Sequence, residues 1–381
     1  MNDPRVDRLA ELVVNYSLGV QEGQVVRIDG FEVAAPLAVA LYRSAILAGA
    51  HPYTNLTLDG LAELLIAEGS DEQIEYLSPV QWQEVEEIDA VITIWSQTNT
   101  RAANRLDARR HGAYIAAQRK LVNRRWERIV GAEMRWCGTL HPTNAHAQDA
   151  DMSLADYEKF FHAACHTDAD APEEHWRGTA AELERRAAEL GEARELRIVG
   201  PDTDLRVGIG GRTWIAADGR FNMPDGEVFT SPVETETSGD IRFSFPATFH
   251  GHAVEDVRLR FEDGRVVAAE ASKGETYLNE LLELDAGARV LGEVAFGLNY
   301  EIDRFTRNIL LDEKIGGTMH VALGAGFGQA GSENSSALHW DLICDLREGG
   351  EVYADGELVW KDGAFLDEAG RGQVAMAETR A

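Results

Sequence analysis

The chain has 381 residues, of which 44% are apolar, so it can bury a sizeable core, and its length favours two domains. It carries 65 Asp and Glu residues against 36 Lys and Arg, a formal net charge of −29, and no basic stripe, so nucleic acid is excluded as an expected partner. No segment reaches the about 18 uninterrupted apolar residues of a membrane span, and the amino terminus lacks the apolar run of a signal peptide, so we expect a cytoplasmic protein without a membrane partner.

The first half of the chain alternates helical and strand patterns, which predicts an N-terminal α/β domain over residues 1–190. Short apolar runs predict strands at 25–30, 50–58 and 89–96. Apolar residues at helical spacing predict helices at 7–18, 35–48, 60–69, 153–165 and 178–190. Ser153 is the expected N-cap of the fourth helix, and the fifth is the expected connection between the domains.

Short, often alternating segments divided by Gly, Asp and Pro follow Gly191 and predict a β-rich antiparallel domain over residues 191–370. These segments lie at 196–200, 204–209, 213–217, 241–245, 257–261 and 266–272, and one helix is expected among them at 276–284. The predicted fold is therefore an α/β domain followed by an α+β, β-rich domain, which we expect to be the metal-binding catalytic one.

The densest group of potential metal ligands lies between residues 226 and 345. His339 and Asp341 are two residues apart in the apolar run at 337–344, so on a strand both point to one face, while Trp340 and Leu342 point to the other. A His and a carboxylate on one face of a strand suit a metal site, because the backbone sets their spacing.

Three further potential ligands occupy similar settings. His320 follows two glycines inside the alternating apolar stretch at 316–324, and Glu227 and Glu293 each follow a glycine at the start of an apolar strand. Burying an ionised, unpaired carboxylate costs several kcal/mol or more, so a nearby cation is one natural resolution.

The formal charges of these residues indicate how many cations the site would hold. Glu227, Glu293 and Asp341 contribute three negative charges and two neutral imidazoles contribute none, so a single divalent ion leaves the site negative. Two divalent ions leave one positive charge, which a bridging hydroxide would cancel. Such a donor set suits Zn, Mn or Co, and two ions can activate a bridging water and polarise a carbonyl, so hydrolysis is expected.

Taken singly, each of these residues has a plainer interpretation, since a lone His on a strand is often a hydrogen-bonded core group and a Glu after Gly is often a turn acid. Spacing alone leaves both interpretations open. His250 and His252 repeat the two-residue spacing without a matching acid, and His141 and His146 are expected at the surface or in a substrate subsite. Glu313 is either a base beside the ligands or a surface turn acid.

Four motifs, in order, resemble the thermophilic aminopeptidase family typified by aminopeptidases T and S: GEVFTSP at 226–232, LGEVAFG at 291–297, DEKIGGTMHVALG at 312–324 and NSSALHWDLICDLR at 334–347. A weaker likeness covers 41–53 and 143–153 in the first half. The resemblance implies a homodimer in which two divalent ions are bound by five residues: Glu227, Glu293, His320, His339 and Asp341.

One residue departs from the pattern of that family. Seven residues after its first His the family commonly has a tyrosine whose phenol contacts a metal, and this chain has Phe327, which offers no oxygen. The departure concerns metal occupancy and rate more than the fold.

The sequence is therefore interpreted as a metal-dependent aminopeptidase that cleaves peptides with a free N-terminus. One ion would bind the α-amine and the other the scissile carbonyl, and a carboxylate would shuttle the proton, with Glu227 and Glu293 as the predicted catalytic residues. Two alternatives stay open: a dinuclear-metal hydrolase of another small amide, and a noncatalytic binding protein descended from a peptidase.

Two residue types bear on the environment of the protein. The three cysteines, Cys137, Cys165 and Cys344, show no paired spacing, so neither disulfides nor a zinc ribbon are expected. Only five of the 36 basic residues are lysines. An acid-rich, lysine-poor surface suits concentrated salt, where self-repulsion is screened, so a halophilic source is expected; the alternative is an ordinary acidic enzyme from a genome that favours arginine codons.

Overall fold

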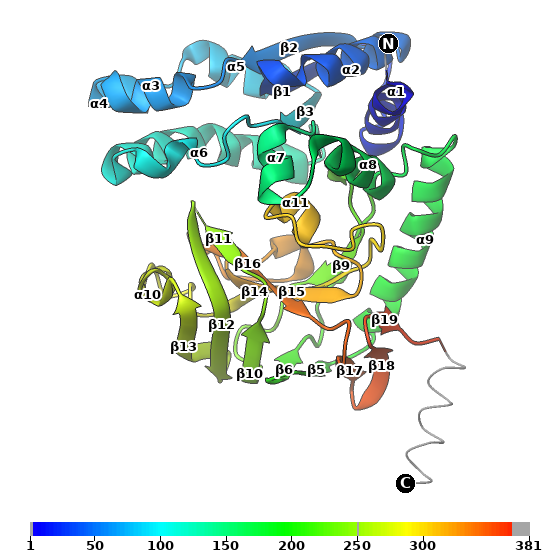
Figure 1. Cartoon of the computed structure of the whole chain (residues 1–381), viewed down its shortest axis with the longest axis vertical. Helices are drawn as coiled ribbons and strands as arrows, with labels where there is room; N and C mark the ends of the chain where they lie inside the picture. The colour runs from blue at the N-terminus through cyan, green and yellow to red at the C-terminus, as the bar shows by residue number, and fades with distance from the viewer. Residues whose placement is uncertain (1–2, 250, 368–381) are drawn as a thin grey trace. The chain divides into compact units, whose positions relative to one another are not determined.

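The computed structural model describes residues 3–249 and 251–367, and these separate into two units (Figure 1). The first comprises Met1–Trp176 and Gly219–Pro224, and the second comprises Arg177–Asp218 and Asp225–Ala381. The segment Gly219–Pro224, which the sequence analysis includes in the second domain, thus belongs to the first unit. Within the described ranges no helix is long and apolar enough to cross a membrane.

A parallel five-stranded sheet forms the centre of the first unit, with the strand order β2-β1-β3-β4-β8. The strands are β1 (Val25–Phe31), β2 (His51–Thr57), β3 (Ala90–Trp95), β4 (Arg135–Leu140) and β8 (Asn222–Met223). β3 is almost entirely buried, as expected of a central parallel strand whose two faces are both covered. The predicted α/β class is confirmed.

Helices connect these strands, and most lie where the sequence predicts them. They are α1 (Pro4–Glu11), α2 (Ala35–Leu47), α3 (Leu61–Glu68), α4 (Asp71–Glu75), α5 (Pro79–Glu87), α6 (Ala108–Val130), α7 (Asn144–Asp149), α8 (Leu154–Ala164) and α9 (Pro172–Gly191), with short 3₁₀ turns at Glu32–Ala34 and Ala102–Arg105. The helix expected at 7–18 begins earlier and changes to a π-helix at Leu12–Ser17, whereas Ser153 caps α8 as predicted, its side chain accepting from the Asp156 N–H. The long α6 was not predicted.

Two antiparallel sheets form the second unit, which confirms the predicted β-rich class. The larger has the order β11-β12-β10-β6-β5-β17-β18-β19, with β13 also paired to β12. Its strands are β5 (Glu195–Gly200), β6 (Thr203–Gly208), β10 (Thr237–Phe243), β11 (Ala247–Phe249), β12 (His252–Glu262), β13 (Arg265–Lys273), β17 (Glu351–Ala354), β18 (Glu357–Lys361) and β19 (Ala364–Phe365). Figure 1 shows β12 and β13 as a long hairpin beside α10 (Glu275–Leu282).

The smaller sheet has the order β16-β15-β14-β9-β7. Its strands are β7 (Ile215–Ala217), β9 (Glu227–Thr230), β14 (Leu291–Gly297), β15 (Thr318–Gly324) and β16 (His339–Asp345). Side chains of both sheets share one hydrophobic core, with Val207 and Val257 from the larger sheet and Val294, Val321 and Leu342 from the smaller. A short helix, α11 (Ile309–Asp312), lies between β14 and β15, and a 3₁₀ turn, Gly328–Ala330, lies between β15 and β16. The sequence predicted α10 in this domain but not α11.

Candidate metal centre

Four neighbouring strands of the smaller sheet carry the five predicted ligands. Glu227 begins β9, Glu293 lies near the start of β14, and His320 lies within β15. His339 and Asp341 are the first and third residues of β16. The strand order places all four strands side by side, although the residues span more than a hundred positions of the sequence.

The register of the strands puts these side chains on one face of the sheet. Ala322 pairs with Glu293 on one side and Asp341 on the other, and His320 lies two residues from Ala322. Opposed residues in an antiparallel pair share a face, as do residues two apart on one strand. The other face carries the buried core, which includes Trp340 and Leu342, so the predicted division of β16 into two faces is confirmed.

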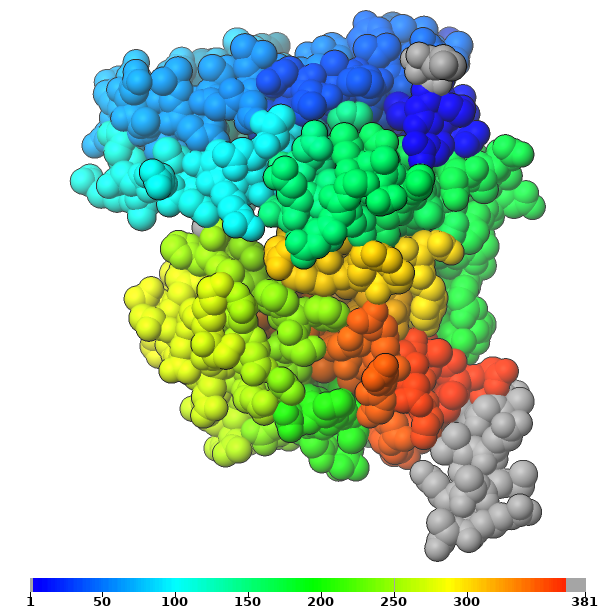
Figure 2. Space-filling view, viewed as in Figure 1, coloured from blue at the N-terminus to red at the C-terminus, as the bar shows by residue number. Residues whose placement is uncertain are grey.

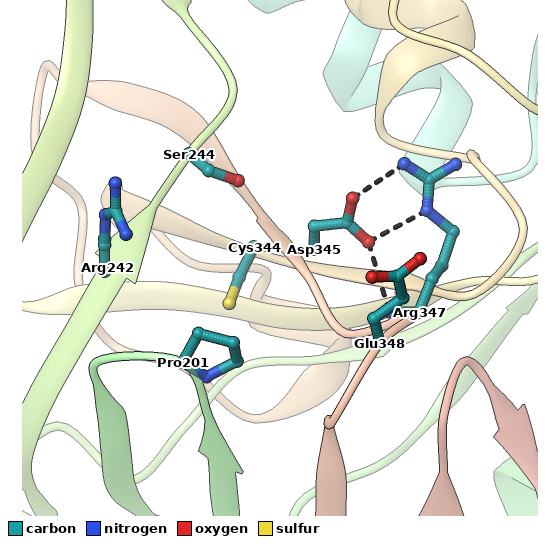
Figure 3. A pocket seen from close by; sticks show the side chains of 7 residues that line it. All are labelled: Pro201, Arg242, Ser244, Cys344, Asp345, Arg347 and Glu348. Carbon is teal, nitrogen blue, oxygen red and sulfur yellow. Dashed lines mark hydrogen bonds and ion pairs between the residues drawn. The ribbon is translucent and has the colours of Figure 1, made fainter.

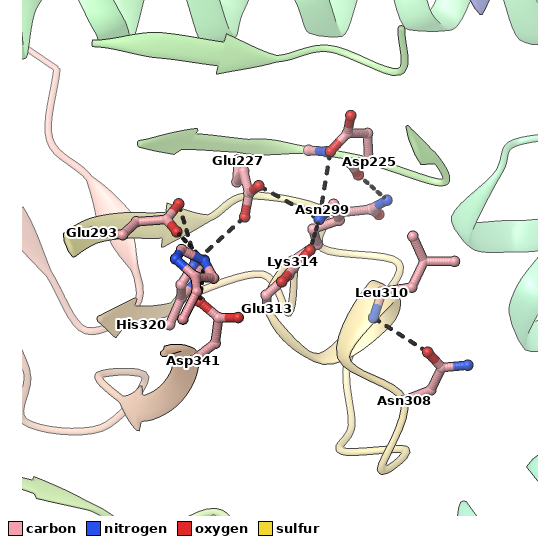
Figure 4. Close-up of polar contacts among 12 residues, drawn as sticks. Asp225, Glu227, Glu293, Asn299, Asn308, Leu310, Glu313, Lys314, His320 and Asp341 are labelled. Carbon is pink, nitrogen blue, oxygen red and sulfur yellow. Dashed lines mark hydrogen bonds and ion pairs between the residues drawn. The ribbon is translucent and has the colours of Figure 1, made fainter. Parts of the chain in front are cut away.

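The five side chains meet above that face, as Figure 4 shows for four of them. The Nε2 atom of His320 lies 3.7 Å from Glu227 Oε2 and 3.7 Å from Glu293 Oε1. The Nε2 atom of His339 lies 3.4 Å from Glu293 Oε2 and 3.7 Å from Asp341 Oδ1. The predicted residues therefore form one cluster of three carboxylates and two imidazoles.

Two overlapping triads of these residues and Glu313 could each hold a metal ion. Glu293, His339 and Asp341 form one, Glu313, His320 and Asp341 form the other, and in each the ligand atoms lie within 4.8 Å of one another. Asp341 belongs to both triads. The sequence left the position of Glu313 open, and the structure brings it beside the predicted ligands, with its side chain 18% exposed.

A buried oxygen of the cluster fits a cation. Glu227 Oε2 has no hydrogen-bond partner within the described part of the chain. His339 Nδ1 lies 2.8 Å from the Ala325 carbonyl, so it donates there and leaves the Nε2 lone pair facing the carboxylates. The donors on this face are oxygen and nitrogen, because the Cys344 side chain of β16 lies on the core side, and such a set suits Zn, Mn or Co.

The electrostatics of the cluster favour positive charge. Burial raises the pKa of Glu227 to about 8 and that of Asp341 to about 6. Burial opposes charge on Glu293 as well, but the contacts with His320 and His339 outweigh it and lower this pKa to about 2. Burial also opposes protonation of the imidazoles, yet the carboxylates raise the pKa of His320 to about 9 and of His339 to about 10. A divalent ion would compete with those protons for the same positions.

Lys314 is a member of the cluster that the sequence analysis missed. Its side chain is fully buried, and Nζ lies 3.5 Å from Glu227 Oε1, 3.7 Å from Asp225 Oδ1 and in close contact with Glu313. Its charge offsets that of Glu313, and Asp225 adds a further buried carboxylate on the same side of the cluster. The signal available in the sequence was a lysine in a lysine-poor chain, directly after two acids.

Phe327 lies beside the cluster, as its proposed correspondence to a metal-contacting tyrosine requires. Its ring centre is 5.4 Å from that of His339, at 75°, and 5.0 Å from that of Phe229. The Phe327 ring therefore packs against the imidazole of His339, one of the predicted ligands.

Neither His252 nor His146 joins the cluster. His252 is exposed, with its ring stacked on Tyr277, and His250 lies outside the described residues. His146 is buried in α7, with Nε2 3.2 Å from Gln97 Oε1, so the expected surface location is wrong for this residue. Burial lowers its pKa to about 4.

The second unit also has a pocket of about 520 Å³ away from the candidate ligands. The residues that line it include Arg242, Cys344, Asp345 and Arg347 (Figure 3). The two guanidinium groups are already paired. Arg347 contacts Asp345 at 2.7 Å, and Arg242 contacts Asp256 at 2.6 Å. Neither guanidinium group of this pocket is therefore available without breaking an ion pair.

Comparisons with known proteins agree with this geometry. Residues 2–365 match the family described as Thermophilic metalloprotease (M29). Aminopeptidase 2 of Geobacillus stearothermophilus is 29% identical over 88% of this chain and 87% of its own length, and aminopeptidase T of Thermus thermophilus is 30% identical over 76% of each. The solved structure of wild-type AmpT from Thermus thermophilus superimposes with a TM-score of 0.85, covering 95% of this chain and 99% of the other at 24% identity, which shows a shared fold.

Proposed function

Because this chain belongs to the thermophilic metalloprotease family M29 and is by family a metallo-aminopeptidase, we propose that it removes N-terminal residues from peptides at a two-ion centre on its smaller sheet. The observation that carries the proposal is the convergence of three carboxylates and two imidazoles, from Glu227, Glu293, His320, His339 and Asp341, on one face of that sheet. The family resemblance further supports a homodimer whose substrates are peptides with a free amino terminus. The composition supports a cytoplasmic protein from a salt-rich source.

In this proposal Glu227, Glu293, His320, His339 and Asp341 hold two divalent ions, with Zn, Co or Mn as the candidates. Bound ions would lower the pKa of a water molecule and polarise the scissile carbonyl. One ion would bind the free α-amine of the peptide, which a blocked peptide lacks.

Proton transfer is assigned to the carboxylates of the cluster. Glu227 and Glu293 were predicted as catalytic residues, and their side chains are only 8% and 6% exposed. Glu313 is more accessible at 18% and touches Lys314, so it is better placed to exchange a proton with a leaving amine, while Glu227 and Glu293 act mainly by holding the ions.

The test measures cleavage of amino-acid p-nitroanilides and dipeptides after chelation and after addition of Zn, Co or Mn. We expect chelation to remove activity and an added ion to restore it, and N-acetylated peptides to be resistant. Cleavage of blocked peptides alone would refute exopeptidase action. Cleavage of other small amides but of no peptide would favour a dinuclear-metal hydrolase with a different substrate. Metal binding without any turnover would favour a noncatalytic binding protein descended from a peptidase.

Matched variants test the residues. His339→Ala and Asp341→Ala should abolish activity with the circular dichroism spectrum retained, because the apolar face of β16 already specifies the strand. The controls are His252→Ala and Asp240→Asn, which alter exposed residues of the larger sheet and should leave activity unchanged. Normal turnover in either ligand variant would remove this cluster from consideration.

A further inference from the structure

A cavity of about 300 Å³ adjoins the candidate metal centre within the second unit. His339 and Asp341, two of the proposed ligands, form part of its wall. The rest of the wall comes mainly from β11, from the segment 305–312 and from Ile343. The volume is at the small end of the range for ligand sites, so the cavity suits a single side chain better than an extended peptide.

Apolar groups dominate the wall of this cavity. Phe249 of β11 packs against Trp340, with ring centres 5.9 Å apart. Phe305 stacks on Phe245 with ring centres 5.2 Å apart and planes at 16°, so its ring is held from outside the cavity. Ile309, which is 49% exposed, adds an aliphatic side chain to the same wall. In the space-filling view the segment 305–312 is at the surface, coloured gold (Figure 2).

The charged groups of the wall argue against an acidic occupant. Asp312 is buried, and its Oδ1 accepts hydrogen bonds from the Thr306 N–H and hydroxyl, both at 2.7 Å. Asp341 adds a second carboxylate. Arg307 is the one cationic side chain among the described lining residues apart from the imidazole of His339, and it is exposed. A carboxylate placed deep in the cavity would therefore lie beside Asp312, and among the described lysine and arginine side chains only the exposed Arg307 lies in the wall to pair with it.

We propose that this cavity receives the side chain of the substrate's N-terminal residue, and that it makes large apolar and aromatic residues the preferred ones. The inference rests on the proposed aminopeptidase function. An exopeptidase holds both the amine and the carbonyl of the N-terminal residue at its metal centre, so the side chain on the intervening Cα enters whatever space adjoins the ligands. Here that space has the wall of Phe249, Phe305 and Ile309.

The kinetic test compares kcat/KM for dipeptides X-Ala in which X is Gly, Ala, Leu, Phe or Glu. We expect Leu and Phe to exceed Gly by about tenfold or more, and Glu to be poorest. Phe305→Ala should lower the Phe to Gly ratio by about tenfold with little effect on Gly, and Phe305→Arg should raise the Glu to Phe ratio. Leu284→Ala, which removes an exposed side chain of the same unit outside the cavity, is the control and should change no ratio.

A second readout does not depend on turnover. Calorimetry of the metal-loaded protein with L-phenylalanine, L-leucine and glycine should show tighter binding of the two large amino acids, and Phe305→Ala should remove the difference. Circular dichroism checks that each variant is folded.

The outcomes separate the two levels of the inference. If the wild-type protein cleaves no peptide, the proposed function fails, and calorimetry still decides whether the cavity selects apolar side chains. If peptides are cleaved with ratios that Phe305→Ala and Phe305→Arg leave unchanged, the cavity assignment is overturned alone. If the Phe305 variants change the kcat/KM ratios of Ala-X dipeptides but not those of X-Ala dipeptides, the cavity binds the second residue, and its assignment to the N-terminal residue is overturned.

Discussion

Lys314 shows how a single buried charge can hold the candidate site together. Its ammonium group is enclosed by Asp225, Glu227 and Glu313 and fully withdrawn from solvent. Their negative charges raise the pKa of this lysine despite its burial. Removal of one partner from a buried ion cluster leaves uncompensated charge in a medium of low polarity, which costs far more than loss of a surface pair.

We therefore predict that Lys314→Met lowers the free energy of unfolding by about 3 kcal/mol in metal-free protein, measured by urea denaturation. Divalent ions should reduce that loss, because they supply positive charge to the same carboxylates. Lys361→Met is the matched control, since Lys361 is 42% exposed and pairs with Glu351 at 2.9 Å, and it should cost at most about 1 kcal/mol. Equal losses in the two variants would contradict the assigned role of Lys314.

Phe327 is the other residue whose identity carries a testable consequence. Its ring contacts His339 where the resembled family commonly has a phenol. One ion should then be held less firmly than the other, so metal removal should proceed in two stages. We predict that Phe327→Tyr tightens the weaker stage about tenfold, measured by calorimetric titration of the metal-free protein. Two equally tight sites in the wild type, unchanged in the variant, would show that another group already fills that coordination position.

Among the elements, the smaller sheet acts as the scaffold of the site, and a bulge in β14 sets its geometry. The pairing of β14 with β15 shifts between Leu291 and Glu293, so Gly292 is the extra residue. A Cβ atom there would lie 2.0 Å from the Ala325 carbonyl oxygen, which also accepts from His339. The backbone thus approaches closely where the sheet positions Glu293 and His339.

We predict that Gly292→Ala destabilises the protein by about 2 kcal/mol or more and weakens metal binding, because β14 and the Ala325 peptide must move apart. Urea denaturation and metal titration measure the two effects. Gly112→Ala in α6 is the control, because a Cβ there meets nothing within 4 Å, and a helix interior gains up to about 1 kcal/mol from this change. Unaltered stability and metal affinity in Gly292→Ala would mean that the bulge tolerates a side chain.

At the scale of the whole molecule, the net charge of −29 is the dominant property. Like charges repel across the surface, and salt shortens the range of that repulsion to about 3 Å at 1 M. We predict a melting temperature that rises between about 0.1 and 2 M KCl. Sorbitol at equal osmolality, which adds no ions, is the control. A flat or falling melting temperature in KCl would refute the inference of adaptation to salt.

Local pattern was sufficient for the class of each half of the chain. The alternation of helical and strand periods in the first half predicted an α/β unit, and the short segments after Gly191 predicted antiparallel sheets, because both periods follow from which side chains face a core. The pairing of His339 with Asp341 on one face of β16 was predictable for the same reason. α6 was missed, since its apolar positions are weakly marked among many charged residues.

Three features depended on the tertiary structure alone. The convergence of Glu227, Glu293, His320 and Asp341 requires the order and register of four strands, and a pairing register between distant segments is not encoded in either segment by itself. Burial of Lys314 and the placement of Glu313 depend on the turn that precedes β15, where a lysine and an acid would otherwise read as surface groups. The cavity bounded by Phe249, Phe305 and Ile343 exists only because three separate segments meet, namely β11, residues 305–312 and β16. The amino-acid sequence by itself thus determined the kinds of element and the candidate ligands, through local periodicity and residue chemistry, whereas long-range packing decided which charges share one dry site and what lies next to it.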